Sequence, residues 1–335
     1  MLKNILLFVG VTVVCLLALE PLTRLFVDTG KVYELEMWKY ATQVKQRDYR
    51  PNFGHRHRAN ADARLMGEDV RTDSHGFRGP ELSPRAAPGV ARIAFDGDSI
   101  AMGWGVAENE TIPNQVVAGL QAEGRKVDGF NLGVGNYNTT QELASYRDIG
   151  MPLKPDIVVL IYFINDGEPM PSYSDGNWFE EHSEAWVVFK YRMDALLRSS
   201  GEVPDWRKYY RDLYKPEAEG WKRTQEALAE FAKLTRDTGA KFIVVNVPEL
   251  HELKPYPFAD VTAKVRSVVE AQGVTFVDLL PTVENLDPSS LWVTVPDPHP
   301  NGKADIAMSK GIVPVLRPLL DELCRTEGKG CKADQ

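Results

Sequence analysis

The chain has 335 residues, 43% of them hydrophobic, which is enough for one large or two ordinary globular domains with a sizeable core. Its 39 lysines and arginines against 47 aspartates and glutamates give a net charge of −8. This balance excludes a basic face for nucleic acid or anionic lipid, so we expect no nucleic-acid partner.

The N-terminal segment is typical of a targeting signal. Lys3 precedes an uncharged apolar run over residues 5–19, which Glu20 and Pro21 end. The run is shorter than the roughly 20 residues of a relaxed membrane span, yet no A-x-A-like cleavage site follows it. We therefore predict a signal anchor over residues 1–24 that holds the chain to the inner membrane, with the remainder on the periplasmic side. A cleaved, secreted form and a buried N-terminal helix are the alternatives.

Residues 25–90 are predicted to form a spacer and docking arm that ends in a Pro/Ala/Gly linker. Three of the six histidines lie in this segment: His55, His57 and His75. The His-Arg-His pattern is compatible with metal binding, but zinc sites need three or four ligands at defined spacing, and this stretch has no cysteine or second cluster. We expect a solvated loop and no metal.

Five short apolar runs predict buried strands. They cover residues 91–98, 127–133, 155–163, 241–247 and 273–279. The amphipathic stretches between them are long enough for crossover helices, which predicts a parallel sheet. The fold class is therefore α/β: a three-layer α/β/α domain over residues 91–320 with a five-stranded parallel sheet. Such sheets bind ligands outside the carboxyl ends of their strands.

An aromatic-rich insertion over about residues 168–220 interrupts this alternation. It holds Trp178, Trp186 and Trp206, and Trp221 lies at its edge. Aromatic faces stack on sugar rings and acyl chains. The insertion is therefore either a lid or substrate platform, or a satellite hydrophobic cluster that only holds itself together.

The polar C-terminal tail, residues 321–335, contains two of the three cysteines. Cys324 and Cys331 are close enough in sequence to close a small disulfide loop, which fits an oxidising compartment. Two separate exposed thiols are the alternative.

Polar turns follow the first three predicted strands. Ser99 lies in a strand-to-helix turn, where backbone N–H groups and the helix dipole favour an anion; a plain helix cap is the alternative there. The second strand ends in a Gly/Asn-rich turn with Gly135 and Asn136, whose N–H groups suit an oxyanion. The third strand leaves the Asn165 amide at the same edge. We predict a nucleophile and its oxyanion hole at this edge.

Asp297 and His299 lie two residues apart in the loop that follows the fifth predicted strand. If the loop turns back, Asp297 fixes the tautomer of His299 and stabilises the imidazolium that forms when His299 takes the Ser99 proton. His182 and His251 are competing bases, but no adjacent strand end supplies either with a partner in the expected place. We predict the catalytic triad Ser99, His299 and Asp297.

These residues resemble the sequence blocks of the SGNH hydrolase superfamily of GDSL-like esterases and acetylhydrolases, over about residues 90–320. The similar blocks are Gly97-Asp98-Ser99, Asn165-Asp166, and Asp297 with His299. The resemblance implies a flavodoxin-like SGNH fold, with Asp98 and Asp166 supporting the catalytic groups.

Two positions depart from the family pattern: Asn136 stands where the family usually has a second glycine, and Ile164 replaces the usual glycine ahead of Asn165. Asparagine tolerates the left-handed backbone conformation better than most residues. Either Gly135 or Asn136 therefore supplies the backbone oxyanion donor, beside Ser99 and Asn165.

The upstream Asp-Ser-His-Gly-Phe-Arg-Gly stretch, residues 73–79, also resembles membrane-anchored bacterial members that act outside the cytoplasm. The resemblance implies a serine esterase or deacylase whose substrate is an acylated glycan or lipid of the cell envelope, in the first place an O-acetyl ester. An O-acyltransferase with the same acyl-enzyme and a catalytically silent glycan-binding component of polysaccharide export are the alternatives. We expect no cofactor, and the sequence identifies no protein partner.

Overall fold

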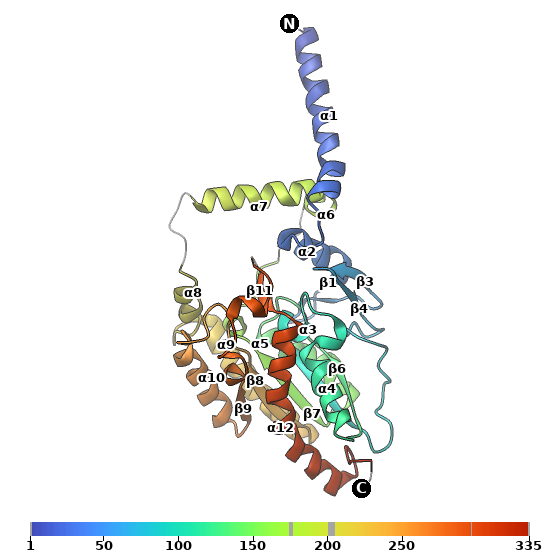
Figure 1. Cartoon of the computed structure of the whole chain (residues 1–335), viewed down its shortest axis with the longest axis vertical. Helices are drawn as coiled ribbons and strands as arrows, with labels where there is room; N and C mark the ends of the chain where they lie inside the picture. Colours follow the sequence, from blue (N-terminus) through green and yellow to red (C-terminus); the bar gives the residue numbers. More distant parts are fainter. Residues whose placement is uncertain (1, 174–176, 200–204, 296, 334–335) are drawn as a thin grey trace.

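A five-stranded parallel sheet forms the centre of the computed structural model, which describes residues 2–173, 177–199, 205–295 and 297–333 (Figure 1). The strand order is β6-β5-β7-β8-β9. The strands are β5 (Ala91–Gly97), β6 (Val127–Asn131), β7 (Ile157–Tyr162), β8 (Lys241–Asn246) and β9 (Thr275–Asp278). All five predicted strands and their parallel arrangement are confirmed.

Helices cover both faces of this sheet, which confirms the three-layer prediction. Successive residues of a strand face opposite layers: Phe95 packs into the core on one side and Ala94 into the core on the other. The first layer is formed by α4 (Ile112–Ala122) and α12 (Gly302–Glu327). The second layer is formed by α5 (Thr139–Ser145), α9 (Glu219–Thr238) and α10 (Ala259–Ala271). Strands buried on both faces have to be apolar at nearly every position, which explains the continuous runs in the sequence.

The segment before the sheet folds against it and is called the arm here, residues 33–80. It contains α2 (Tyr33–Lys39), a π-helical turn (Tyr40–Val44), and the antiparallel pairs β1 (Lys45–Asp48) with β2 (Gly54–His57) and β3 (Asp62–Leu65) with β4 (Glu68–Arg71). Its apolar side chains share a small core with Met102 and Trp104 of the catalytic domain. The arm is therefore part of the folded body.

The expectation of a solvated His-Arg-His loop is wrong. His55 and His57 lie on β2 and are buried. His57 Nε2 lies 2.7 Å from the Tyr40 hydroxyl, and His55 Nε2 lies 2.9 Å from the carbonyl oxygen of Gly135. His55 thus reaches the catalytic domain, whereas His57 bonds within the arm, to Tyr40 and to the carbonyl of Gly76. Their burial is the main cause that lowers the pKa of each ring to about 3.

An apolar helix, the insertion and a disulfide loop lie outside these layers. The N-terminal α1 (Leu2–Phe26) stands out from the body and is long and apolar enough to cross a membrane (Figure 1). The insertion after the third sheet strand contains α6 (Trp178–His182), α7 (Glu184–Ser199) and α8 (Trp206–Leu213). At the opposite end, Cys324 and Cys331 form a disulfide, which confirms their predicted pairing.

Candidate active site

Ser99 begins the short helix α3 (Ser99–Met102) directly after β5. Asp98 caps this helix by accepting a hydrogen bond from the Ile100 N–H at 2.8 Å. The turn requires glycine at position 97, where φ is +150° and a Cβ atom would lie 2.7 Å from the Ile161 carbonyl oxygen. The tight turn places the Ser99 hydroxyl at the carboxyl edge of the sheet.

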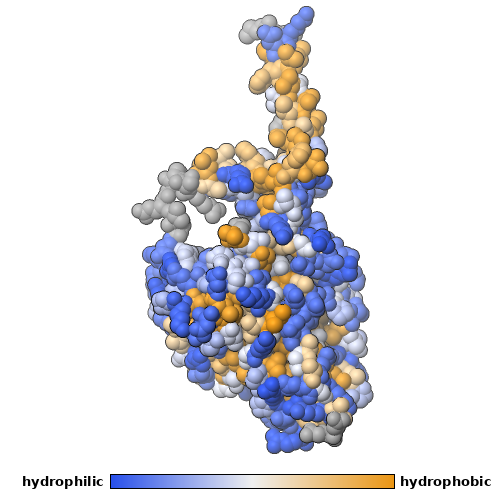
Figure 2. All heavy atoms as spheres, viewed as in Figure 1, coloured by the Kyte–Doolittle hydropathy of each residue, from blue (hydrophilic) through white to orange (hydrophobic). Residues whose placement is uncertain are grey.

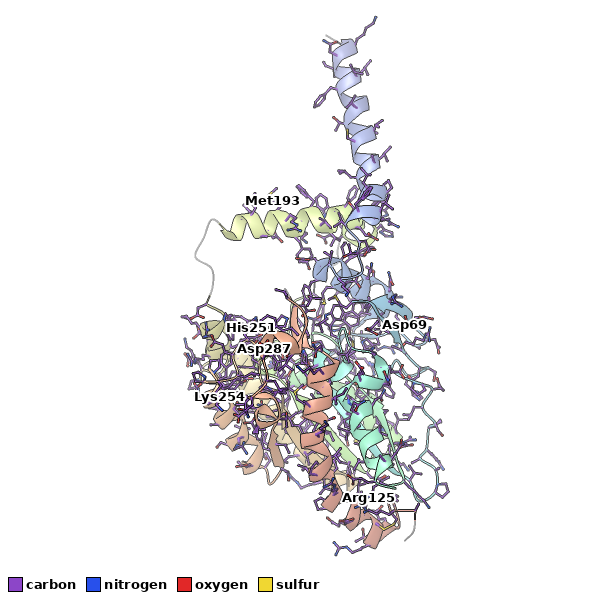
Figure 3. The ribbon with its side chains drawn as sticks, in the orientation of Figure 1. Asp69, Arg125, Met193, His251, Lys254 and Asp287 are labelled. Atoms are coloured by element: carbon purple, nitrogen blue, oxygen red, sulfur yellow. A yellow bond between two sulfur atoms is a disulfide. The ribbon has the colours of Figure 1, made fainter. Side chains whose placement is uncertain are left out.

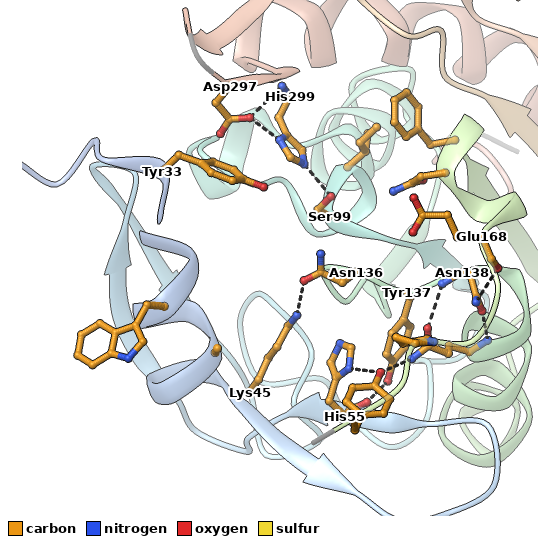
Figure 4. Close-up of a pocket in the computed structure, with 18 of the residues that line it drawn as sticks. Tyr33, Lys45, His55, Ser99, Asn136, Tyr137, Asn138, Glu168, Asp297 and His299 are labelled. Atoms are coloured by element: carbon orange, nitrogen blue, oxygen red, sulfur yellow. Dashed lines mark hydrogen bonds and ion pairs between the residues drawn. The ribbon is translucent and has the colours of Figure 1, made fainter. Parts of the chain in front are cut away.

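His299 and Asp297 reach this hydroxyl from β11 (Asp297–Pro300), which pairs with β10 (Trp292–Thr294). Ser99 Oγ lies 2.9 Å from His299 Nε2, and His299 Nδ1 lies 2.5 Å from Asp297 Oδ1 (Figure 4). A neutral ring that donates Nδ1–H to Asp297 accepts the Ser99 proton at Nε2. The structure thus brings together the three residues predicted as a triad, in the order that proton transfer needs.

Trp104 supports Asp297 from behind and was not identified by sequence reasoning. Its indole N–H donates to Asp297 Oδ2 at 2.7 Å, and its side chain is buried. Burial opposes ionisation of Asp297, but the hydrogen bonds from His299 and Trp104 outweigh it and hold the pKa of Asp297 below its usual value. Arg78 of the arm fixes the loop around Trp104 by donating to the carbonyls of Met102 and Val106, at 3.0 and 2.7 Å.

Asn165 and Asp98 form a second pair beside Ser99. Asn165 Nδ2 donates to Asp98 Oδ2 at 3.0 Å, and both Asn165 and Ser99 line the same cavity. An asparagine amide carries two hydrogens, so one remains for an oxyanion. Burial is the largest influence on Asp98 and raises the pKa of its carboxyl, against the bonds from Ile100 and Asn165.

The two candidate backbone donors after β6 are in different situations. The Gly135 N–H donates to the Tyr40 hydroxyl of the arm at 2.7 Å, so this N–H is not directed at a substrate. Asn136 adopts the left-handed conformation, with φ at +67°, and lines the cavity. Of the two N–H groups that the sequence left open, the one at Gly135 is therefore already bonded to the arm, and Asn136 is the residue that lines the cavity.

Lys45 of the arm holds the Asn136 side chain. Its Nζ donates to Asn136 Oδ1 at 2.7 Å and lies 4.4 Å from the centre of the Tyr40 ring (Figure 4). Burial lowers the pKa of Lys45 to about 7. Near pH 7 the ammonium and the neutral amine of Lys45 therefore coexist in this wall.

Asp166 lies behind the site, fully buried. Its Oδ2 accepts a hydrogen bond from the Phe163 N–H at 3.0 Å. Burial, followed by the nearby charge of Asp98, raises the pKa of Asp166, and burial beside Asp166 also raises that of Glu142. Simultaneous ionisation of these two buried carboxyls is therefore disfavoured.

His251, the rival base, lines the same cavity but has a different partner. Its Nδ1 forms a short hydrogen bond with Glu249, which is the main cause that raises the pKa of His251. Ser99 makes its hydrogen bond with His299 instead. His182 also lines the cavity, where its ring bonds the carbonyl of Trp178.

A cavity of about 1200 Å³ surrounds Ser99 and His299. It lies between the carboxyl edge of the sheet, the arm and α6. Charged and aromatic side chains dominate its wall, among them Tyr33, Lys45, Arg47, Glu168, Tyr173 and Tyr210. The space exceeds the typical 300–1,000 Å³ of a small-molecule site.

One cluster away from the cavity has the residue types of a metal site. Asp73, His75 and Glu81 place ligand atoms within 4.8 Å of one another. Asp73 Oδ1 already accepts hydrogen bonds from the N–H groups of His75 and Phe77, both at 2.8 Å, and thereby shapes a turn. The group is explained by that turn, and we assign no metal to it.

Comparison with known proteins places this site in a family. Residues 95–304, more than half of the chain, match the GDSL-like Lipase/Acylhydrolase family. A search of curated proteins finds no match.

The solved structures to which the chain is similar include several esterases. TesA is 17% identical, with a TM-score of 0.46 over 68% of this chain and 99% of its own. The psychrotrophic esterase EstA from Pseudoalteromonas sp. is 15% identical, with a TM-score of 0.43 over 69% and 98%. An acetylxylan esterase from Geobacillus stearothermophilus is 16% identical, with a TM-score of 0.42 over 68% and 94%. Similarity at this level does not extend to the substrate.

The family match begins at the end of the strand that leads to Ser99 and continues beyond His299. The chain therefore belongs to the GDSL-like lipase/acylhydrolase (SGNH) family and is a serine hydrolase of carboxylic esters.

Proposed function

We propose that the protein removes an ester-linked acyl group, in the first place O-acetyl, from a cell-envelope glycan or lipid through Ser99, His299 and Asp297. The observation that carries this proposal is the 2.9 Å contact between Ser99 Oγ and His299 Nε2, continued from His299 Nδ1 to Asp297. This alignment lets the hydroxyl lose its proton as it attacks a carbonyl carbon.

The reaction then has two halves. As Ser99 Oγ bonds to the carbonyl carbon, its proton moves to His299 Nε2 and the carbonyl oxygen becomes an oxyanion. The backbone N–H groups of Ser99 and Asn136 and the second amide hydrogen of Asn165 stabilise that charge. The C–O bond to the alcohol breaks as His299 protonates the leaving oxygen. Water attacks the acyl-Ser99 ester by the reverse sequence and releases the carboxylic acid.

The wall of the cavity supports a polar substrate in which the acyl group is attached to a sugar. Lys45, Arg47 and Glu168 offer charged hydrogen-bonding groups, and Tyr173 and Tyr210 offer aromatic faces that stack on sugar rings. A volume of about 1200 Å³ leaves room for sugar units beside a small acyl group. The exposed apolar helix α1 supports a membrane anchor that keeps the enzyme on the outer side of the inner membrane.

The full-length enzyme in detergent is tested with p-nitrophenyl acetate and with O-acetylated oligosaccharides, by measuring nitrophenol and acetate release. We expect turnover that falls to background in Ser99→Ala and His299→Ala, and falls about 100-fold in Asn165→Ala. An acetyl adduct on Ser99, trapped by rapid acid quench and mass spectrometry, identifies the nucleophile. Full turnover in His299→Ala with loss in His251→Ala would instead assign the base to His251.

A further inference from the structure

One face of α7 carries large apolar side chains that are exposed. Trp186, Phe189 and Met193 are 36%, 53% and 39% exposed. They are spaced three and four residues apart and therefore lie on one side of the helix. The basic residues Lys190 and Arg192 lie on either side of this apolar face. This pattern is typical of a helix that lies in the interface of a membrane.

The short helix α6 extends the apolar face. Trp178 and Phe179 are 64% and 55% exposed, and the Phe179 ring centre lies 5.9 Å from that of Trp186. We call Trp178, Phe179, Trp186, Phe189 and Met193 the α6–α7 surface. Tryptophan is enriched where a membrane meets water, because its ring is apolar and its N–H is polar.

Glu20 fixes the start of α7 to α1. Its carboxylate accepts hydrogen bonds from the Ser183 hydroxyl at 2.8 Å and from the Glu184 and Ala185 N–H groups at 3.3 and 3.2 Å. Glu20 is also the first charged residue after the apolar run of residues 5–19. The α6–α7 surface is therefore attached at the level where the apolar part of α1 ends.

The direction of α7 fits a membrane surface as well. Figure 1 shows α7 running crosswise to α1, between α1 and the catalytic domain, and Met193 lies on it apart from that domain (Figure 3). Figure 2 shows the hydrophobic surface of α1 meeting that of α7. If α1 stands across a bilayer, a crosswise helix at its foot lies along the bilayer surface.

We propose that the α6–α7 surface docks onto the lipid bilayer that α1 enters, with Trp178, Trp186 and Phe189 inserted at the level of the headgroups. The inference rests on the membrane anchor of the proposed function. The binding partner of the α6–α7 surface is lipid, because this surface is continuous with α1 and lies level with the end of the apolar run of α1. Apolar insertion carries the contact, which agrees with a chain whose net charge is −8.

Docking places the active-site cavity beside the membrane. Glu180, Glu181 and His182 of α6 line that cavity, and the Trp38 indole N–H of the arm donates to the Glu180 carbonyl at 2.6 Å. The cavity wall and the lipid-facing side chains thus share one short helix. The substrate class that fits this arrangement is an acyl ester presented at the membrane surface, such as a glycan still attached to a lipid.

The test uses the full chain reconstituted in phosphatidylcholine nanodiscs. Nitroxide labels are attached at Phe189→Cys and Met193→Cys in a Cys15→Ser background, and paramagnetic resonance compares accessibility to oxygen, which enters lipid, with accessibility to a water-soluble nickel chelate. Lys233→Cys on α9, whose side chain is 67% exposed, is the control in water. Cys15 labelled in the otherwise unchanged chain reports α1. Thermal unfolding by circular dichroism checks the fold of each variant.

We expect an oxygen-to-nickel accessibility ratio several-fold higher at positions 189 and 193 than at 233. Nickel accessibility equal to that of the control would overturn the docking proposal, while a lipid signal at Cys15 in the same experiment would leave the anchor intact. Labels shielded from both probes would also overturn it, because a second protein copy would then cover the surface. A water signal at Cys15 would refute the anchor itself.

Discussion

Replacing Trp104 with phenylalanine isolates the support of Asp297. The substitution removes the indole N–H that donates to Asp297 Oδ2 at 2.7 Å and keeps an aromatic ring in the same buried position. A hydrogen bond to a charged group contributes about 1.5–3 kcal/mol. Asp297 stays ionised throughout the proposed reaction, so most of this hydrogen-bond energy is the same in the ground state and in the transition state. Only the part that changes when His299 becomes positively charged affects the rate. We expect kcat/KM to fall about tenfold, which corresponds to about 1.4 kcal/mol.

The assay compares hydrolysis of p-nitrophenyl acetate by Trp104→Phe with that by Trp221→Phe. Trp221 is also buried, but it packs against Tyr214 in the core behind the sheet. The control therefore suffers a similar loss of volume without a change at Asp297. A rate within twofold of the unchanged enzyme would refute the reasoning, as would an equal loss in Trp221→Phe. The first result would mean that the His299 contact alone holds Asp297.

Three further substitutions test the surroundings of the site by the free energy of unfolding. Tyr40→Phe leaves the Gly135 N–H and His57 without their shared hydroxyl and should cost about 2 kcal/mol, seen as a lower Tm. Lys45→Met should stabilise the fold most below pH 7 and progressively less towards pH 10. The pKa of Lys45 is lowered to about 7 in the folded protein, so the folded chain loses this proton at a lower pH than the unfolded chain. The native enzyme therefore gains stability between pH 7 and pH 10, and the advantage of the variant shrinks. Glu142→Gln should stabilise increasingly above pH 5, because the raised pKa of Glu142 keeps a proton that the unfolded chain releases. Paired titrations of Tm against pH check both signs, and parallel curves for variant and native enzyme would contradict them.

The sheet and the sites at its edge were predictable because they follow from local patterns. A strand buried on both faces has to be a run of apolar residues, and β7 is one from Ile157 to Tyr162. Parallel strands end at a common edge, so the polar residues after β5 and β7 had to meet there. Ser99 and Asn165 do line one cavity, although they are 66 residues apart in sequence.

The arm was not predictable because its contacts are long-range and polar. Tyr40 reaches the Gly135 N–H across a separation of 95 residues, and His55 meets the Gly135 carbonyl across 80. The His-Arg-His pattern alone does not distinguish a buried strand from a solvated loop, since histidine is common in both settings. The sequence signal for burial was that His55 and His57 occupy alternate positions of a short strand. Four residues are too few to establish the two-residue period of a half-buried strand.

The features that the chain shares with its family and those particular to this chain lie in different parts of the sequence. The family match begins at residue 95, within β5, whereas Lys45, Tyr40 and the wall that they form precede it. Tyr40 accepts a hydrogen bond from the Gly135 N–H, and Lys45 donates one to the Asn136 side chain. Family membership thus defines the reaction class, while the arm and α6 define the surroundings of Ser99. Both also lie at the foot of α1, so with the proposed membrane anchor the elements around Ser99 would be those nearest to the bilayer.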